Sequence, residues 1–477
     1  MTTREFAHTI MGQLPYSPTQ QQVEVIAALA RFCSQHAPQE AVFLLNGYAG
    51  TGKTSLCSAL VRALGGVGIG TVLLAPTGRA AKVFASFAQH PAYTIHRRIY
   101  ATAGNGITSS RSMRVAENRS RNCVFIVDEA SMIGGDSATS NLLEDLVHYV
   151  YSGINCRLIL LGDTAQLPPV GCENSPAMDP AVLHAMGLRV TRATLTATVR
   201  QAAESGILYN ATWIRRAMRQ NPLPEPVIRV TPFPDIDVLD GEQLADSIEQ
   251  AYARGGILST ILITRSNQRA AEFNRAVRTM ILGAEEELAS GEVLLISKNN
   301  YFWSRQAKGI DFLANGDMAV VDKVYGTEFR YGHRFADVRL TLPDRDISFD
   351  CKIILSTLLS DMPSLTNTQV VELFDNIASD PELEDPDAPP GAPHKELTAG
   401  QRSTLAMRSP YLNALQVKYG YAVTCHKAQG GQWADVYVDL SYIPPELMGM
   451  EFYRWLYTSV TRATTRLHLI SHTVEIR

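Results

Sequence analysis

The sequence has little surplus charge, few cysteines and no motif that pairs them. Its 43 basic and 47 acidic residues give a net charge of −4, so no global basic field is available to attract nucleic acid. If nucleic acid is the partner, the positive charge must be concentrated locally. The 7 cysteines are scattered, odd in number and without a C-x-x-C pair, which argues against a disulfide framework or a zinc site. We therefore expect a protein of a reducing compartment.

Long apolar runs are absent too. Residues 1–18 contain no continuous apolar core, so no secretory signal is predicted. Nowhere do about 18 apolar residues follow one another, which predicts no membrane-spanning helix. The chain of 477 residues, 45% of them hydrophobic, is too long for one ordinary domain and can build more than one core.

What the sequence does contain is a series of short apolar runs, each followed by a polar or glycine-rich turn. Helix-like stretches lie between them, and near-continuous apolar strands that alternate with helices indicate a parallel sheet covered on both faces. The predicted fold class is therefore α/β, with one such sheet in each half of the chain. The predicted strands are 41–46, 71–75, 123–127 and 157–162, followed by 259–264, 435–440 and 466–471.

Two segments break this rhythm. Residues 97–122 lack apolar periodicity and are rich in Gly, Ser and Arg. Residues 311–410 read as short strands, and 329–355 within them resemble antiparallel hairpins. The acidic, proline-rich stretch 379–393 cannot bury enough apolar area to offset its ordering entropy, so we expect a mobile loop there.

The most specific motif is Gly47–Thr54, GYAGTGKT, which follows a predicted strand and opens a predicted helix. Its glycines let backbone N–H groups converge on phosphate oxygens, and the helix N-terminus adds partial positive charge. Lys53 is expected to reach the β- and γ-phosphates, and Thr54 is expected to ligate Mg²⁺. The expected cofactors are therefore ATP and Mg²⁺.

Three polar residues follow the next strands of the predicted sheet. Asp128 and Glu129 come directly after strand 123–127, where a carboxylate faces the ligand crevice of an open α/β sheet. We expect Asp128 to hold the Mg²⁺ shell and Glu129 to polarise an attacking water, a pairing that disfavours a small-molecule kinase. Gln166 follows the strand after that. Its amide suits a γ-phosphate sensor, but a solvated loop glutamine is an equal alternative.

In this order the motifs resemble those of superfamily one helicases of the Dda/RecD-like branch, with phage helicases of the Dda type as the nearest pattern. The resemblance implies two RecA-like P-loop domains with ATP between them, a pin-type insertion in the first and a small SH3-like β-barrel insertion in the second. The matching blocks are 47–54, 75–81, 94–96, 128–132, 162–170, 195–201, 421–430 and 457–463. The implied boundaries are 1–96 and 123–200 for the first RecA-like domain, 97–122 for the pin, 201–310 and 411–477 for the second RecA-like domain, and 311–410 for the β-rich insertion.

The resemblance also assigns residues to the nucleotide. Gln20 matches the adenine-reading glutamine, although Tyr16 replaces the usual leading leucine. Arg200 and Arg462 match the two arginines that reach the γ-phosphate from the second domain, a role that suits a guanidinium. With Lys53, Glu129 and Gln166 they form the implied catalytic set, and Thr54 and Asp128 form the metal site. The implied nucleotide contacts are Gln20, Gly47, Ala49, Gly50, Thr51, Gly52, Lys53, Thr54, Ser55, Gln429 and Gly430.

A second set of residues matches those that line the single-strand groove in the family. Hydroxyls, imidazoles and cations can contact phosphates without reading sequence. The structural alternative for each is a helix cap or a satisfied loop polar group. The set is Pro76, Thr77, Thr94, His96, Arg97, Arg98, Thr424, His426 and Lys427.

The predicted pin is locally basic, as phosphate binding requires. The alternative is a solvated arginine-rich loop. The aromatic cluster 301–303 suits base stacking, although core packing is the more economical interpretation. The arginines of the pin are Arg97, Arg98, Arg111, Arg114, Arg119 and Arg121, against Glu117 alone.

Together these features predict an ATP-dependent 5′ to 3′ DNA helicase that moves along single-stranded DNA and unwinds duplex. One alternative is a RecD-like motor subunit of a larger nuclease complex, and another is a nucleic-acid binding protein switched by ATP without unwinding. The expected partners are single-stranded and forked DNA, with a single-strand-binding protein or factors of replication, repair or recombination. We expect a monomer without membrane attachment, in the cytoplasm of a bacterial cell or a phage-infected host.

Overall fold

The computed structural model describes residues 1–34, 38, 40–101, 114–134, 141–197, 204–305, 313–343, 345–383, 397–441, 443–470 and 474–477. The chain divides into two compact units. The first unit combines most of residues 1–263 with 425–477, and the second contains residues 264–424. The N-terminal and C-terminal segments therefore belong to the same unit although they are far apart in the sequence.

The first unit contains a parallel sheet of six strands in the order β3-β2-β6-β7-β1-β8. The four strands predicted in the first half are confirmed within a few residues, and both edge strands, β3 and β8, are additional. The strands are β1 (Ala41–Gly47), β2 (Gly70–Ala75), β3 (Ala92–Thr94), β6 (Arg121–Val127), β7 (Ile154–Gly162) and β8 (Arg189–Leu195).

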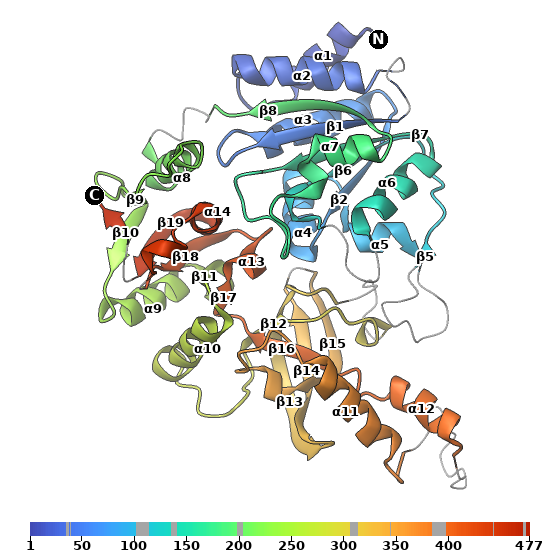
Figure 1. Cartoon of the computed structure of the whole chain (residues 1–477), viewed down its shortest axis with the longest axis vertical. Helices are drawn as coiled ribbons and strands as arrows, with labels where there is room; N and C mark the ends of the chain where they lie inside the picture. The colour runs from blue at the N-terminus through green and yellow to red at the C-terminus, as the bar shows by residue number, and fades with distance from the viewer. Residues whose placement is uncertain are drawn as a thin grey trace. The chain divides into compact units, whose positions relative to one another are not determined.

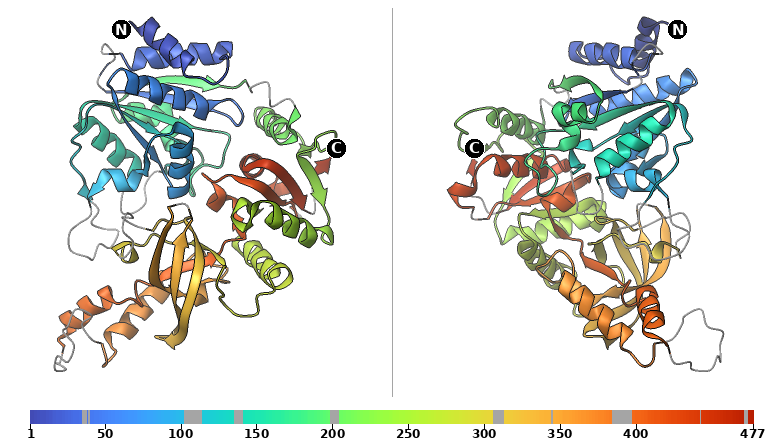
Figure 2. Two further views of the ribbon diagram at one scale, coloured as in Figure 1. Left: turned by 180° about the vertical axis from the view of Figure 1, so that it is seen from behind. Right: turned by 45° about the vertical axis from the view of Figure 1, so that its right-hand side comes forward.

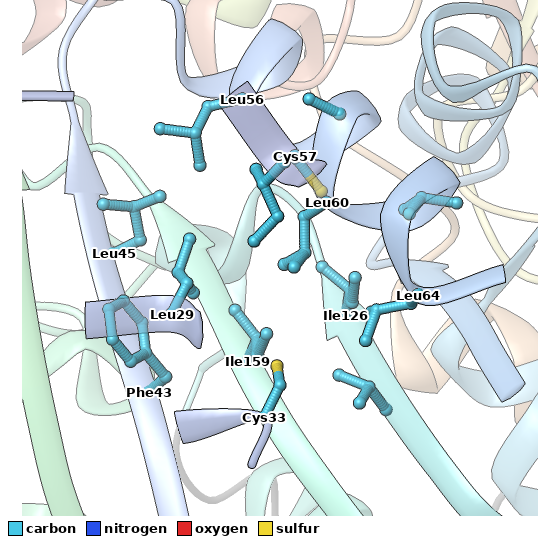
Figure 3. Close-up of a cluster of buried hydrophobic side chains, with 14 of the residues drawn as sticks. Leu29, Cys33, Phe43, Leu45, Leu56, Cys57, Leu60, Leu64, Ile126 and Ile159 are labelled. Carbon is cyan, nitrogen blue, oxygen red and sulfur yellow. The ribbon is translucent and has the colours of Figure 1, made fainter. Parts of the chain in front are cut away.

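Helices cover both faces of this sheet (Figure 2). Alternate side chains of one strand point to opposite faces, so Phe43 packs under one helical layer and Val42 under the other. Figure 3 shows the first layer, where Leu29 and Leu60 meet Phe43 and Ile126. The first layer contains α1 (Thr3–Gly12), α2 (Gln20–Phe32), α3 (Lys53–Gly66) and α4 (Gly78–Ala88), and the second contains α5 (Ile95–Ile99), α6 (Leu142–Ser152) and α7 (Pro180–Ala185).

The predicted pin, residues 97–122, begins within α5. Strands β4 (Tyr100–Ala101) and β5 (Arg114–Val115) pair antiparallel, which is the base of a hairpin. Residues 102–113, with Arg111, lie outside the described residues. Arg97 and Arg98 belong to α5 and Arg121 belongs to β6, so the hairpin itself is shorter than the predicted insertion.

The first unit contains a second parallel sheet, in which β10, β19, β18 and β11 are neighbours in that order. Three of these strands were predicted. Helix α13 (Cys425–Ala428) precedes β18. The strands are β10 (Ile236–Leu239), β11 (Thr260–Thr264), β18 (Trp433–Asp439) and β19 (Ala463–Ile470), with helices α8 (Gly206–Ala217), α9 (Gln243–Gly255) and α14 (Met450–Val460) and the short pair β9 (Val227–Ile228) and β20 (Glu475–Ile476).

The second unit contains a closed five-stranded barrel, as the resemblance implied. The barrel extends beyond the predicted bounds 311–410, because its closure needs β12 to pair with β16, where Leu294 faces Tyr419. Trp303 is buried and its Nε1 donates to the carbonyl of Asn413 at 2.9 Å, which favours core packing over base stacking for this ring. The strands are β12 (Val293–Ile296), β13 (Met318–Arg330), β14 (His333–Leu342), β15 (Ile347–Ile354) and β16 (Leu415–Tyr419), accompanied by α10 (Asn267–Ala276) and β17 (Ala422–Thr424).

A helical pair interrupts the barrel between β15 and β16 and was not predicted. Helix α11 (Asn367–Ala378) begins with a capping box formed by Thr366 and Gln369, and α12 (Ala399–Arg408) lies beside it (Figure 1). Leu373 from α11 packs on Phe335 of the barrel. Of the predicted acidic loop, residues 384–393 lie outside the described residues. Among the described helices, none combines the length and the hydropathy that a bilayer crossing requires.

Phe43→Ala tests whether the core shown in Figure 3 carries the stability of the first unit. The ring is 0% exposed and makes an edge-to-face contact with Phe32 at 5.5 Å. The free energy of unfolding should therefore fall by about 3–5 kcal/mol. The control is Phe87→Ala, whose ring is 55% exposed and should cost under about 0.5 kcal/mol. Equal urea midpoints for both variants by circular dichroism would contradict this assignment of the core.

Candidate nucleotide site

The phosphate loop lies between the end of β1 at Gly47 and the start of α3 at Lys53. Gly50 and Gly52 adopt φ angles of 72° and 78°, which side chains other than glycine rarely tolerate. A Cβ on Gly52 would lie 2.5 Å from the Tyr16 hydroxyl and 2.7 Å from Gln22 Nε2. The loop therefore has the glycine-dependent backbone conformation expected of a phosphate cradle, and Gln22 bonds to both the Thr51 carbonyl and the Tyr16 hydroxyl beside it.

Lys53 and Asp128 meet beside this loop. Lys53 Nζ lies 3.3 Å from Asp128 Oδ1, and both side chains are nearly buried. Burial lowers the pKa of Lys53, but the carboxylates of Asp128, Glu129 and Asp163 outweigh it, so the pKa is raised and the lysine is cationic. The phosphate-loop lysine and the acid after β6 therefore form an ion pair, and their predicted roles toward phosphate and Mg²⁺ stay predictions.

Glu129 is held in an unusual backbone conformation. Its φ of 51° lies in the left-handed region, and its N–H donates to Asp128 Oδ1 at 2.8 Å. Its Oε2 is buried and, among the described residues, has no hydrogen-bond partner. A buried carboxylate oxygen without a donor is costly, and a water molecule is a fitting donor. Gln166 Oε1 is buried and unpartnered in the same sense.

These residues fit a magnesium–nucleotide group. Mg²⁺ is usually held by one or two carboxylates together with phosphates and water, and it needs no all-protein cage. The described residues contain no cluster of three His, Cys, Asp or Glu side chains that could hold a metal alone. Asp128 and Thr54 would hold the ion, and the loop N–H groups with Lys53 would hold the phosphates. Ser55 lies in the first turn of α3.

The loop Asp163–Leu167 receives side chains from the C-terminal segment. Burial raises the pKa of Asp163, and the Tyr457 hydroxyl donates to its Oδ2 at 2.7 Å. Thr458 Oγ1 accepts from the Leu167 N–H at 2.9 Å, and Gln429 Nε2 donates to the Leu167 carbonyl at 2.7 Å. Gln429, predicted as a nucleotide contact, thus donates to this loop, and its contact with nucleotide stays a prediction. Tyr457 and Thr458 lie in a matched block but had no predicted role.

Two arginines were predicted to reach the γ-phosphate. Arg462 is 3% exposed, and its Nε and Nη1 donate to the carbonyls of Thr458 and Gly431 at 3.0 and 3.2 Å. Arg200 lies outside the described residues. Both roles stay predictions. A third arginine, Arg215 on α8, was missed. Its guanidinium donates to the Thr196 carbonyl and stacks 4.2 Å over the ring of Tyr48 in the phosphate loop. No motif contains Arg215, so no sequence signal could find it.

The glutamines after Thr19 divide into different roles. Gln20, the predicted adenine reader, is exposed and its amide donates to Glu24 at 3.3 Å, so its role stays a prediction. Gln22 is buried and donates to the Thr51 carbonyl at 3.1 Å, while its Oε1 accepts from the Thr19 N–H. The spacing of Thr19 and Gln22 is a capping-box signal that could have found this residue.

Two of the predicted single-strand contacts act as helix caps in the structure. Thr77 accepts from the Ala80 N–H at 3.1 Å, and Thr94 accepts from the Arg97 N–H at 3.3 Å. This is the structural alternative, although a capping hydroxyl at a helix N-terminus also suits phosphate binding. A Cβ on Gly430 would lie 3.1 Å from Thr77 Oγ1, so Gly430 passes close to the start of α4.

The other predicted single-strand contacts differ in their surroundings. Burial lowers the pKa of His96 and lowers that of Lys427 to about 8. Arg98 donates to Ser120 Oγ at 3.3 Å, and Arg97 stacks on Tyr93. Pro76 precedes α4, His426 lies in α13, and Thr424 belongs to the second unit. The DNA contacts of all nine residues stay predictions.

Arginines of the predicted pin line a hollow of about 870 Å³ in the first unit. The hollow lies where β6 and β7 begin, whereas the phosphate loop follows the end of β1. The two features therefore lie at opposite ends of the parallel strands. Its lining includes Arg114, Arg119, Arg121 and His148, with Glu117 paired to Arg119 at 3.1 Å. The described part of the segment is thus locally basic, as expected.

Comparison with known proteins adds independent evidence. An AAA-domain family model matches residues 19–221, and the UvrD-like helicase C-terminal domain model matches residues 419–470. The ATP-dependent RecD2 DNA helicase of Deinococcus radiodurans is 32% identical over 168 residues, which cover 35% of this chain and 21% of the relative. The chain therefore matches about a fifth of that relative's length.

Solved structures with a similar chain course include two Pif1 helicases. The Bacteroides protein in complex with ADP-AlF3 and ssDNA is 15% identical, with a TM-score of 0.47 over 95% of this chain and 92% of its own. The Candida albicans protein is 16% identical, with a TM-score of 0.44 over 95% and 94%. The nearer likeness to Dda-type helicases stays a prediction. The two family models in this order, with the RecD2 relative, confirm the wider resemblance to RecD-like superfamily one helicases.

Proposed function

We propose that this chain is an ATP-dependent DNA helicase that moves 5′ to 3′ along single-stranded DNA and unwinds duplex ahead of it. The observation that carries the proposal is the composition of the nucleotide site. The phosphate loop and the two acids after β6 come from the first half of the chain, while Gln429, Tyr457 and Thr458 come from near its C-terminal end. A nucleotide in this cradle would therefore lie beside two segments that are far apart in the sequence and joined by hydrogen bonds.

The site residues have roles that suit hydrolysis rather than binding alone. Bound Mg²⁺ would supply charge stabilisation at the phosphates. Lys53 is held cationic by the surrounding carboxylates and offers its ammonium to the same phosphates. Glu129 Oε2, buried and unpartnered among the described residues, is available to orient a water and accept its proton. An ATP-switched binding protein would not need this acid.

The DNA partners are proposed from charge and position. The basic hollow of the pin segment suits phosphates of single-stranded or forked DNA, because its cations neutralise phosphate charge without reading bases. We propose that the chain acts as a cytoplasmic monomer, with a single-strand-binding protein or factors of replication, repair or recombination as further partners.

Glu129→Gln tests the hydrolytic role. The amide keeps the shape but cannot accept the proton of the attacking water, so DNA-stimulated ATP turnover should fall by about 10²-fold or more. Binding of Mg²⁺–ATP should be retained, as measured by calorimetry. The control Glu144→Gln changes an exposed acid in the first turn of α6 and should leave turnover unchanged. Undiminished turnover in Glu129→Gln would assign the water-activating role elsewhere.

Unwinding by the purified chain separates the alternative functions. On paired forks with either a 5′ or a 3′ single-stranded tail, strand displacement should require the 5′ tail. Displacement that appears only after other subunits are added would favour the RecD-like role. ATP turnover without displacement on either fork would favour a motor or switch that does not unwind, and faster opening from the 3′ tail would reverse the proposed direction.

Lys427→Gln tests a phosphate contact through pH. Burial lowers the pKa of Lys427 to about 8, so the free side chain loses its charge as pH rises through 8. A bound phosphate would favour the protonated form of Lys427 and raise its pKa. Single-strand affinity of the native chain should therefore fall between pH 7 and pH 9. Lys427→Gln should weaken binding at pH 7, lower the salt slope by about 1 and flatten this pH dependence.

Lys82→Gln, on the exposed side of α4, should keep the native pH dependence. Fluorescence anisotropy with a labelled oligonucleotide measures all three proteins. If Lys427→Gln retained the native pH dependence, Lys427 would not contact the phosphates.

A further inference from the structure

We propose that Tyr457 is a positioning residue that ties the phosphate loop to the helix leading to Arg462, and so sets the geometry in which bound ATP is cleaved. The proposal rests on the proposed function and names a residue that the motif comparison left without a role. Tyr457 lies on α14, is 1% exposed, and belongs to the same unit as the phosphate loop.

The Tyr457 hydroxyl joins two parts of the nucleotide site. It accepts from the Ala49 N–H of the phosphate loop at 3.0 Å and donates to Asp163 Oδ2 at 2.7 Å. The other oxygen of Asp163 accepts from the Ala165 N–H at 3.0 Å, so the carboxylate is held on both sides. Burial and Asp163 raise the pKa of Tyr457, so the phenol stays protonated and is a donor.

Neighbouring side chains extend the link. Thr458 follows Tyr457 and accepts from the Leu167 N–H, and Gln429 donates to the Leu167 carbonyl. Both backbone groups of Leu167 are therefore bonded to residues of the C-terminal segment. Hydrogen bonds in such a buried network strengthen one another, and those that end on a carboxylate are the stronger ones.

The position of the link distinguishes it from ordinary core packing. Asp163 faces Lys53 from α3 and Glu129 after β6, the two residues predicted to act on the phosphates and the attacking water. Arg462 follows Tyr457 by five positions, just beyond the end of α14. A shift of α14 away from the loop would therefore move the predicted arginine while leaving the phosphate loop able to bind nucleotide.

The same helix provides a matched comparison. Tyr453 lies one turn before Tyr457, is 0% exposed, and donates its hydroxyl to the Pro224 carbonyl. In this hydrogen bond the Tyr453 hydroxyl contacts neither the phosphate loop nor the loop that contains Asp163. Tyr453→Phe and Tyr457→Phe thus remove the same group from the same helix at the same depth, and only the second removes the link.

The experiment measures single-strand-stimulated ATP turnover, with kcat and KM determined separately. Tyr457→Phe should lower kcat at least about tenfold while KM for ATP changes less than about threefold, because the lost bonds hold the site together and do not hold the ground-state nucleotide. Tyr453→Phe should stay within about twofold of the native kcat. Equal kcat in Tyr457→Phe and the native chain, or equal losses in both variants, would overturn the proposal.

A binding measurement without DNA keeps the test separate from the proposed function. ADP with Mg²⁺ should raise the Tm of the native chain, Tyr453→Phe and Tyr457→Phe alike. Further addition of aluminium fluoride should raise the Tm again in the first two proteins and not in Tyr457→Phe. The same second rise in Tyr457→Phe would overturn the positioning role. Failure of the native chain to unwind DNA would count against the proposed function alone.

A double variant guards against a merely folding-related loss. In Asp163→Ala, the acceptor of the Tyr457 hydroxyl is absent, so adding Tyr457→Phe should cost clearly less in kcat than it does in the native background. Losses that multiply independently would show that Tyr457 acts through something other than Asp163, and the proposed link would be wrong.

Discussion

One buried cation surrounded by three carboxylates determines the character of this molecule. Lys53 lies 3.3 Å from Asp128 and shares its surroundings with Glu129 and Asp163. A single ammonium faces two buried acids, Asp128 and Asp163, and the half-buried Glu129, and burial raises the pKa of Asp163. The Ala165 N–H and the Tyr457 hydroxyl donate to Asp163, and a bound divalent ion would supply the additional positive charge. The first parallel sheet brings these groups together at the carboxyl ends of its strands.

The second consequence of this charge cluster is that it couples distant parts of the sequence. Asp163 obtains a donor from Tyr457, nearly 300 positions later, and the adjacent Leu167 is bonded by Thr458 and Gln429. These contacts lie within one compact unit, so the C-terminal segment is bonded to the proposed nucleotide site. A motor needs such a connection, because a change at the phosphates must reach a second element before it becomes movement. The hydrogen bonds supply a physical route for it.

Much of the fold could be predicted from the sequence because its central strands are uniformly apolar. The strands containing Phe43 and Ile126 are buried on both faces, and this leaves a pattern that composition reveals. Edge strand β8 was missed because Arg189 and Arg192 face solvent. The resemblance implied the barrel, but its first and last strands, β12 and β16, were not predicted. These two strands pair with each other across more than 100 residues of sequence, as Leu294 and Tyr419 show. The spacing of Thr366 and Gln369 is a capping-box signal that predicts the start of α11.

The candidate site was predictable only where a motif fixes the residue. Strand ends and a glycine loop determine the positions of Lys53, Asp128 and Glu129, so the motifs place these residues near one another. Arg215 and Gln22 reach the loop through tertiary packing, which short-range patterns do not encode.

The central claim is that residues 47–54 and 425–467 respond to the same nucleotide. Hydrogen–deuterium exchange of the native chain, with and without Mg²⁺, ADP and aluminium fluoride, tests it directly. The account predicts slower exchange in both segments together. Protection confined to 47–54, with unchanged exchange across 425–467, would contradict it.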